Sequence, residues 1–197
     1  MLRYFYACRD VSLFDAIKKA LVMSLSEIER REASPSAAII DSQSVKSTES
    51  GGVGGYDAGK KIKGRKRHIV VDTLGLILVV IVHSAGIQDR DGAKLVFEQL
   101  VRRGFERMQL IWADAGYRGA LIEWVKAATT WTLEIVKRSD DVKGFKVLPK
   151  RWIVERTFGM LVRFRRMTRD YEETTKSSEA WIRLSMIHIM VRRLAPS

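Results

Sequence analysis

Cysteine is almost absent from this chain of 197 residues, which contains only Cys8. A single thiol cannot form an intramolecular disulfide, so the sequence excludes a small secreted fold stabilised by disulfides and predicts a reducing, cytoplasmic location. Histidine is also scarce. His68, His83 and His188 are scattered along the chain without cysteine partners, which argues against a zinc site.

Long hydrophobic runs are missing as well. The longest, Leu74–Val82, has nine residues, whereas a helix needs about 20 to cross a bilayer. Residues 1–22 mix charged side chains with apolar ones and lack the apolar core of a secretory signal. We therefore expect a cytosolic protein that has no membrane partner.

The charge is strongly unbalanced. Lys and Arg total 35 against 23 Asp and Glu, which gives a net charge of +12 at pH 7. Such an excess favours a polyanionic partner, most often a nucleic acid. The alternatives are a soluble protein that is merely basic, or a protein bound to a membrane surface. The second is disfavoured because no long cationic amphipathic helix is present.

Hydrophobic periodicity predicts a mixed α/β fold. Short apolar, β-branched runs predict strands, and apolar residues at helical spacing predict helices between them. This alternation is typical of one domain with a mixed sheet covered by helices on both faces. We expect helices at 11–32, 92–104, 117–129, 151–171 and 177–195, the last with Ser177 or Ser178 as its N-cap, and strands at 37–41, 68–72, 76–84, 107–114 and 131–138.

Two polar stretches are expected to be loops. Residues 139–149 form one, and residues 46–67 are interpreted as a mobile loop or an extended basic arm. The arm carries six cations that are expected to contact phosphate, and the alternative is a solvated loop. If most of them met phosphate, log affinity would fall against log salt with a slope near −5. The six residues are Lys60, Lys61, Lys63, Arg65, Lys66 and Arg67.

Three acids are candidates for a site. Asp41 and Asp114 each follow an apolar strand, and the carboxyl ends of strands are where open α/β sheets place their sites. Glu155 lies on a helix whose neighbours are largely apolar. Asp41 could be a simple strand-end cap, or a metal ligand or catalytic acid. Three such carboxylates together would suit hard divalent cations, and two ions about 4 Å apart could activate water at a phosphorus.

Other motifs are given structural interpretations. Residues 54–61 nearly match a phosphate-binding P-loop, but Lys60 is not followed by Ser or Thr and no strand precedes the loop, so a nucleotide cofactor is not expected. Asp72 is placed in a hairpin turn, and Asp89 and Asp91 at a helix start. Arg163, Arg165 and Arg166 lie beyond Glu155 and could either carry a DNA strand toward the acids or solubilise an exposed helix face.

Several motifs occur in one order and together resemble a known family. The resemblance covers roughly residues 30–195 and is to the DDE transposases of bacterial insertion sequences, in particular the insertion-sequence-five family. The motifs are IIDSQSVKS, GGYDAGKKIKGRKRHIVVDTLGLILVVIVHSAGIQDRDGAKLV, IWADAGYRG and RWIVERTFGMLVRFRRM.

The resemblance implies a ribonuclease-H-like mixed sheet flanked by helices. It implies Mg²⁺- or Mn²⁺-dependent cleavage and strand transfer at element ends, with two ions held by Asp41, Asp114 and Glu155 as catalytic residues. Arg151, one helical turn before Glu155, would contact DNA. The implied partners are double-stranded DNA, both terminal inverted repeats and target, and further copies of the chain, in a bacterial cytoplasm at the nucleoid.

Members of this family usually carry a longer N-terminal region that helps to bind element ends. We therefore expect residues 1–34 to be a helical remnant of such a DNA-binding region and residues 35–197 to be the catalytic domain. The alternative to an active enzyme is a shortened DNA-binding remnant, or a regulator of full-length transposase, that does not cut.

Overall fold

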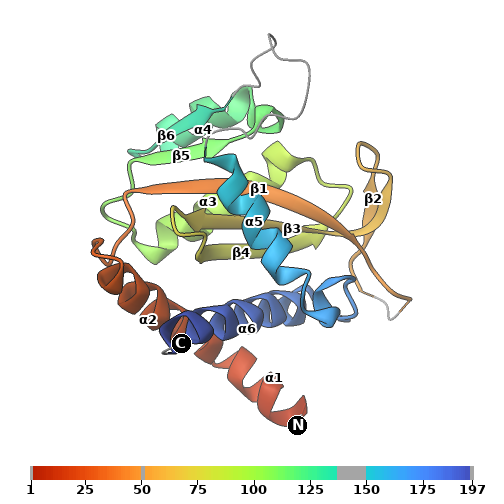
Figure 1. The fold of residues 1–197 in the computed structure, drawn as a ribbon. Coiled ribbons are helices and arrows are strands. Elements are labelled where there is room, and N and C mark those ends of the chain that lie inside the picture. The colour runs from red at the N-terminus through yellow and green to blue at the C-terminus, as the bar shows by residue number, and fades with distance from the viewer. Residues whose placement is uncertain (1, 50–51, 137–149, 196–197) are drawn as a thin grey trace.

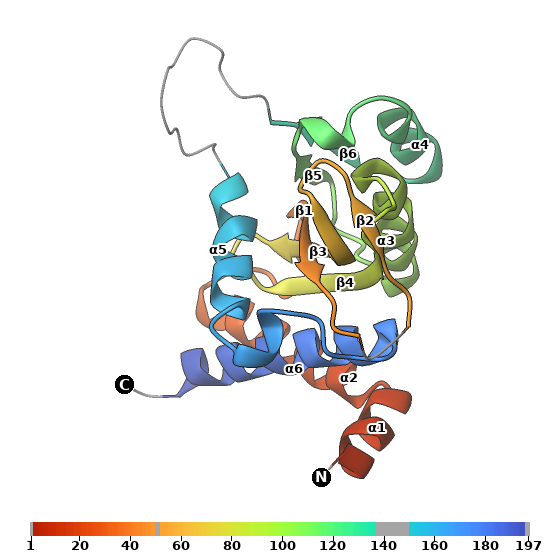
Figure 2. The same cartoon turned by 90° about the vertical axis from the view of Figure 1, so that its right-hand side faces the viewer.

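A computed structural model describes residues 2–49, 52–136 and 150–195. Its centre is a six-stranded mixed sheet, with α5 across one face and α3 and α4 on the other, while α2 and α6 pack together beside β4 (Figures 1 and 2). The elements are α1 (Leu2–Asp10), α2 (Leu13–Ile28), β1 (Ala37–Lys46), β2 (Gly55–Asp57), β3 (Ile62–Asp72), β4 (Ile77–Ser84), α3 (Asp89–Arg103), β5 (Leu110–Ala113), α4 (Ala120–Ala128), β6 (Thr132–Ile135), α5 (Arg151–Leu161) and α6 (Thr175–Leu194).

The strand pairing confirms the predicted fold class. β1 pairs antiparallel with β3, and β3 pairs antiparallel with β4. On the other side of β1, β5 and then β6 continue the sheet in parallel. Three antiparallel strands extended by two parallel ones, with helices on both faces, form the ribonuclease-H-like α/β arrangement. The short strand β2 pairs with the start of β3, where Gly55 lies opposite Gly64.

The predicted hairpin is confirmed, but its first strand, β3, and the neighbouring strand β1 are longer than expected. β1 continues past Asp41 to Lys46, because β3 pairs with it along its length, from Ala38 opposite Asp72 to Lys46 opposite Gly64. The interpretation of residues 46–67 as a mobile loop or basic arm is wrong, since β3 begins at Ile62 and its basic segment is ordinary paired strand.

Two helices are much shorter than predicted. The helix expected over 11–32 runs only from Leu13 to Ile28, after a break at Ser12, whose φ is +57°. The helix expected over 151–171 ends at Leu161 and is followed by a separate 3₁₀ turn at Arg165–Met167. The helix end at Gly104 is confirmed, with glycine in the left-handed conformation.

The last helix starts slightly earlier than predicted. Its N-cap is Thr174, whose hydroxyl accepts a hydrogen bond from the Ser177 amide at 3.2 Å. The loop expected at 139–149 lies outside the residues that the structure describes. In the ranges that are described, no helix is both long enough and apolar enough to span a membrane.

The edge of β4 that has no strand partner among the described residues is covered by side chains from α2 and α6. The Lys18 ammonium donates to the carbonyls of Ile77 and Leu78 at 2.9 and 2.6 Å, and the Val82 amide donates to Glu179 at 3.1 Å. Burial lowers the pKa of Lys18 to about 7. Because these contacts satisfy backbone groups that would otherwise be open to pairing, α2 and α6 together close the sheet on this side.

Candidate active site

Asp41 lies in the middle of β1, at the point where one neighbouring strand stops. β5 pairs with β1 only as far as Ile39, so the edge of β1 that faces β5 is free of strand pairing at Asp41. The Oδ1 atom of Asp41 accepts the Ser42 amide at 2.7 Å. Burial raises the pKa of Asp41 to about 6, and the nearby Asp114 carboxylate adds to the rise. The Asp41 carboxylate therefore needs a cation beside it to remain charged at little cost.

Asp114 follows β5 directly, as predicted, and caps the next turn. Its Oδ1 accepts the amide of Gly116 at 2.8 Å, at the start of the 3₁₀ turn Ala115–Tyr117. Since β5 runs parallel to β1, the end of β5 delivers Asp114 to the level of Asp41. The parallel pairing thus supplies the second carboxylate of the site.

Glu155 comes from α5, the helix that crosses the face of β1 in Figure 1. Its side chain is 55% exposed. One turn earlier on the same helix stands Arg151, whose Nη2 atom lies 3.8 Å from Asp41 Oδ2, 3.6 Å from Asp114 Oδ2 and 3.3 Å from Glu155 Oε1. The three predicted acids therefore converge on a single cationic nitrogen.

The three carboxylates face that guanidinium but do not form a tight cluster among themselves. Within residues 2–49, 52–136 and 150–195, no group of three acid, histidine or cysteine side chains is close enough to bind a metal as it stands. The donor set nevertheless suits a hard divalent ion, because it consists of carboxylate oxygens that already surround a positive charge.

A network behind Asp41 was not foreseen from the sequence. Ser42 donates its hydroxyl to Asp89 at 2.8 Å, and Lys60 donates to the Ser42 carbonyl at 3.1 Å. Asp89 also pairs with Lys66 at 2.8 Å. The sequence placed Asp89 correctly at a helix start, but it could not show that this helix start meets β1 beside Asp41. The network fixes the backbone next to the acid.

A buried chain of rings supports the turn after Asp114. The Tyr117 hydroxyl lies 2.7 Å from His68 Nε2, and His68 Nδ1 lies 2.9 Å from His83 Nε2. Burial, reinforced by His83, holds the pKa of His68 well below its usual range, so its imidazole is neutral. A Cβ at Gly92 would approach His83 to 2.4 Å. Glycine is therefore required where α3 packs on the histidines.

An open groove leads away from the acids. It has a volume of about 360 Å³ and lies between the outer part of β1 and the second half of α5. Glu155 stands at one of its walls and Lys60 at another. Its lining residues are Ser42, Gln43, Ser44, Lys60, Glu155, Phe158, Gly159 and Val162.

The six cations predicted to contact phosphate divide into two groups. Lys60 and Lys61 are exposed at the turn between β2 and β3, and Lys63 is exposed near the start of β3. The other three, Arg65, Lys66 and Arg67, are buried, and each is engaged inside the protein with distant partners: Arg65 with Asp170 at 3.1 Å, Lys66 with Asp89, and Arg67 with the Met167 carbonyl at 2.7 Å. For these three residues, the structure shows a structural role in place of the predicted contact with phosphate.

The arginines after Glu155 do not share one helix face, because α5 ends at Leu161. Arg163 and Arg165 are exposed. Arg166 pairs with Glu172 at 2.6 Å, and its guanidinium lies 4.3 Å from the centre of the Trp181 ring. Their predicted contact with DNA stays a prediction, and Arg166 would have to give up these partners to make it.

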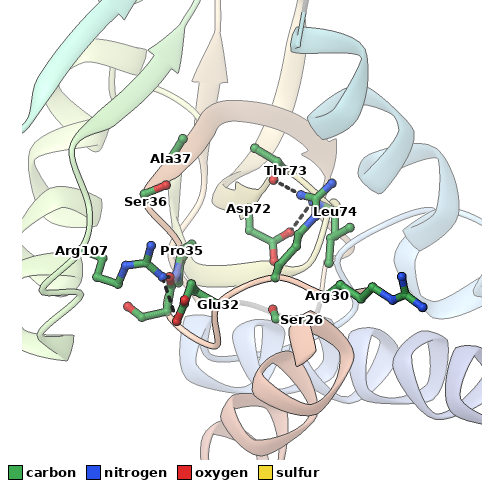
Figure 3. Close-up of a pocket in the computed structure, with 12 residues that line it drawn as sticks. Ser26, Arg30, Glu32, Pro35, Ser36, Ala37, Asp72, Thr73, Leu74 and Arg107 are labelled. Carbon is green, nitrogen blue, oxygen red and sulfur yellow. Dashed lines mark hydrogen bonds and ion pairs between the residues drawn. The ribbon is translucent and has the colours of Figure 1, made fainter. Parts of the chain in front are cut away.

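A second cleft lies away from the three acids and is lined by residues that have structural roles. This cleft has a volume of about 360 Å³ and lies between the end of α2 and the turn joining β3 to β4 (Figure 3). Asp72 lines it and accepts the amides of Leu74 and Leu76 at 2.9 and 2.8 Å, as expected of a turn aspartate. Burial raises the pKa of Asp72 to about 6. None of the three converging acids is among the described residues that line this cleft.

Comparison with known proteins places this geometry in context. A family model described as "Transposase DDE domain" matches residues 32–190. Among solved structures, the catalytic core domain of BIV integrase is similar with 17% identity and a TM-score of 0.44, over 77% of this chain and 81% of that chain. No curated protein matches the sequence.

Proposed function

The chain belongs to the transposase DDE domain family, and we propose that it cleaves DNA at the ends of an insertion element and joins those ends to target DNA. Asp41, Asp114 and Glu155 are the proposed catalytic residues and metal ligands. The motifs quoted from the sequence support assignment to the insertion-sequence-five family within that larger group. The observation that carries the proposal is the convergence of the three acids on one cation position.

The residues present fit divalent metal ions. Asp41 and Asp114 each anchor one carboxylate oxygen on a backbone amide and turn the other toward the shared position. Two Mg²⁺ or Mn²⁺ ions are proposed there, and such ions, when bound, neutralise charge at the phosphorus and activate the attacking oxygen. Glu155, on an exposed part of α5, completes the ligand set and orients the water or 3′ hydroxyl.

The proposed path of DNA follows from the groove between β1 and α5. Lys60 lies in this groove and is fixed by the Ser42 carbonyl at 3.1 Å, so its charge is held close to the acids. Lys61 and Lys63 are exposed beside it. A phosphodiester backbone lying here would meet cations first and carboxylates last, and Arg163 and Arg165 beyond α5 extend the positive surface.

Further proposals concern organisation. We propose residues 1–34 as a helical region associated with DNA binding and residues 35–197 as the catalytic domain, in a chain that acts at the bacterial nucleoid in the cytoplasm. Because two element ends have to be brought together, we propose a homo-oligomer as the active species. Its DNA partners are the terminal inverted repeats and the target.

Salt dependence tests the exposed lysines. Replacing both Lys61 and Lys63 with alanine should make the slope of log affinity against log salt less steep by about 2, since each phosphate contact contributes roughly −0.9. Fluorescence anisotropy between 50 and 300 mM salt measures this slope, with Lys126→Ala as a control on the far helix α4. An unchanged slope would place the DNA on another surface.

Cleavage tests the function itself. Labelled DNA carrying candidate element ends should be nicked by the wild-type chain with Mg²⁺ or Mn²⁺ and left intact with chelator. Asp114→Asn and Glu155→Gln should each lower the rate by at least about a hundredfold, the usual loss when charge stabilisation at the reacting centre is removed. Asp91→Asn and Glu123→Gln, which alter exposed acids, are the matched controls.

The possible outcomes of this cleavage assay can be told apart. Cutting that continues undiminished in Asp114→Asn would exclude the proposed site. No cutting by the wild type, together with intact DNA binding, would favour the alternative of a DNA-binding protein that does not cut.

A further inference from the structure

We propose that Arg151 is the counter-ion of the three acids, and that it must leave its position before divalent ions enter and is then free to bind a DNA phosphate. The inference rests on the proposed function, because it takes Asp41, Asp114 and Glu155 as the metal ligands. It assigns Arg151 a positioning role that precedes any contact with DNA.

The contact geometry supports an exchangeable occupant. The Arg151 nitrogen lies 3.3 to 3.8 Å from the three carboxylates, farther than the 2.7–2.9 Å typical of a charged hydrogen bond. The stronger hydrogen bonds of the two aspartates go elsewhere. Asp41 Oδ1 accepts the Ser42 amide at 2.7 Å, and Asp114 Oδ1 accepts the Gly116 amide at 2.8 Å. Arg151 is thus held mainly by charge, which a metal ion can replace.

The two aspartates present matching atoms to the guanidinium. In each, Oδ1 is anchored to the backbone while Oδ2 faces Arg151. The Oδ2 atoms therefore keep their direction when the arginine leaves.

Arginine and metal cannot share the position. Mg²⁺ binds oxygen at about 2.0–2.1 Å, so the ligand oxygens would have to close on the space that the guanidinium now occupies. Two cations there would also repel each other strongly in a partly buried setting. Loading the site is therefore an exchange of one cation for another, and not an addition.

The placement of Arg151 in the fold favours its release. It is the first residue of α5, and the positive end of the helix dipole disfavours a cation at that point. The carboxylates offset this repulsion only while they lack another cation. Because the side chain is long and partly exposed at 19%, it can turn outward without disturbing the helix. Its planar fork is suited to a phosphate.

Metal affinity in the absence of DNA tests the exchange. Calorimetric titration with Mn²⁺ at pH 8 should give an apparent Kd about tenfold lower for Arg151→Ala than for wild type, because the ion no longer displaces a bound charge. Arg151→Gln, which retains most of the side chain's length, should behave in the same way. Arg156→Ala is the control, since this arginine of the same helix donates to the Leu74 carbonyl and not to the acids.

Thermal melting gives a second readout that needs no activity. Without metal, both Arg151 variants should melt below wild type, because the carboxylates lose their counter-ion. With saturating Mn²⁺ the difference should close, since the ion takes over that role. Arg156→Ala should show no such metal-dependent recovery.

Unchanged or weaker Mn²⁺ binding by both Arg151 variants would overturn the inference, as would a melting difference that metal does not close. Failure of the proposed function has a different signature. In that case Asp114→Asn would bind Mn²⁺ as tightly as wild type, which would mean that the acids are not the ligands at all. If Arg151→Ala does not fold, the Arg151→Gln titration decides the question.

Discussion

Replacing Asp170 with alanine is expected to lower the free energy of unfolding by roughly 3–5 kcal/mol, because it leaves the buried Arg65 charge without its acidic partner. Arg65 is 0% exposed, and its Nη1 lies 3.1 Å from Asp170 Oδ1. A loss of this size is a large part of the roughly 5–15 kcal/mol that stabilises an ordinary domain.

The expected loss is large because Arg65 connects distant segments. Its guanidinium also donates to the carbonyls of Val53, Glu172 and Glu173, at 2.7, 2.7 and 2.8 Å, and to the Ser178 hydroxyl at 3.0 Å. It thereby ties β3 to the segment before β2 and to the start of α6. These are hydrogen bonds to a charged donor in a buried place, and they lose their alignment when the carboxylate is removed.

Urea unfolding followed by tryptophan fluorescence measures the loss. Lys126→Ala, which breaks the exposed pair with Glu123 at 3.1 Å, should change stability by less than about 1 kcal/mol. Replacing Arg65 with Met and Asp170 with Leu together should recover part of the loss, because no unpaired charge then remains. Equal effects for Asp170→Ala and Lys126→Ala would show that the buried pair contributes little.

Arg65 also shows why part of this fold could not be predicted. The segment Lys63–Arg67 has the composition of a solvated basic arm, and nothing local distinguishes a buried arginine from an exposed one. Its partner Asp170 is 105 residues away, and the partner of Lys66 is Asp89 on α3. Burial of a charge depends on these distant partners, so sequence patterns that cover a few residues could not reveal it.

The parts that were predicted depend on short-range patterns. The run Leu110–Ala113 is apolar and is followed directly by an aspartate, so both β5 and the position of Asp114 could be predicted. The hairpin at Asp72–Gly75 follows from two β-branched runs around a turn. Asp41 was found by the same pattern, yet its place in the middle of β1 depends on pairing with β3, which continues where the apolar run stops.

Replacing Asp41 with asparagine is expected to abolish cleavage, leave DNA affinity unchanged or higher, and make the folded protein more stable at alkaline pH. Asparagine keeps an oxygen that can accept the Ser42 amide, so the local backbone contact survives. It removes one proposed metal ligand and one negative charge from the surface that would face DNA. The combination distinguishes a catalytic acid from a structural one, because removal of a structural acid would lower the stability of the folded state.

The stability effect has a defined dependence on pH. The pKa of Asp41 rises from 3.8 to about 6 on folding, so between these values the folded chain holds the proton more readily than the unfolded chain. The stability that Asp41 contributes is complete below about pH 4 and is lost as pH rises through 6. Above that pH, Asp41→Asn should gain up to about 3 kcal/mol, since the pKa rises by about two units on folding and each unit corresponds to about 1.4 kcal/mol.

Unfolding by urea at pH 4 and pH 8, beside the cleavage and anisotropy assays, measures all three effects, with Asp91→Asn as the control. The gain should be present at pH 8 and much smaller at pH 4, where the folded aspartic acid is neutral and the unfolded one is only partly ionised. Cleavage retained by Asp41→Asn would remove Asp41 from the site. Loss of DNA binding together with cleavage would mean that Asp41 supports the DNA-binding surface, since a metal ligand can be neutralised without weakening the attraction between a basic protein and a polyanion.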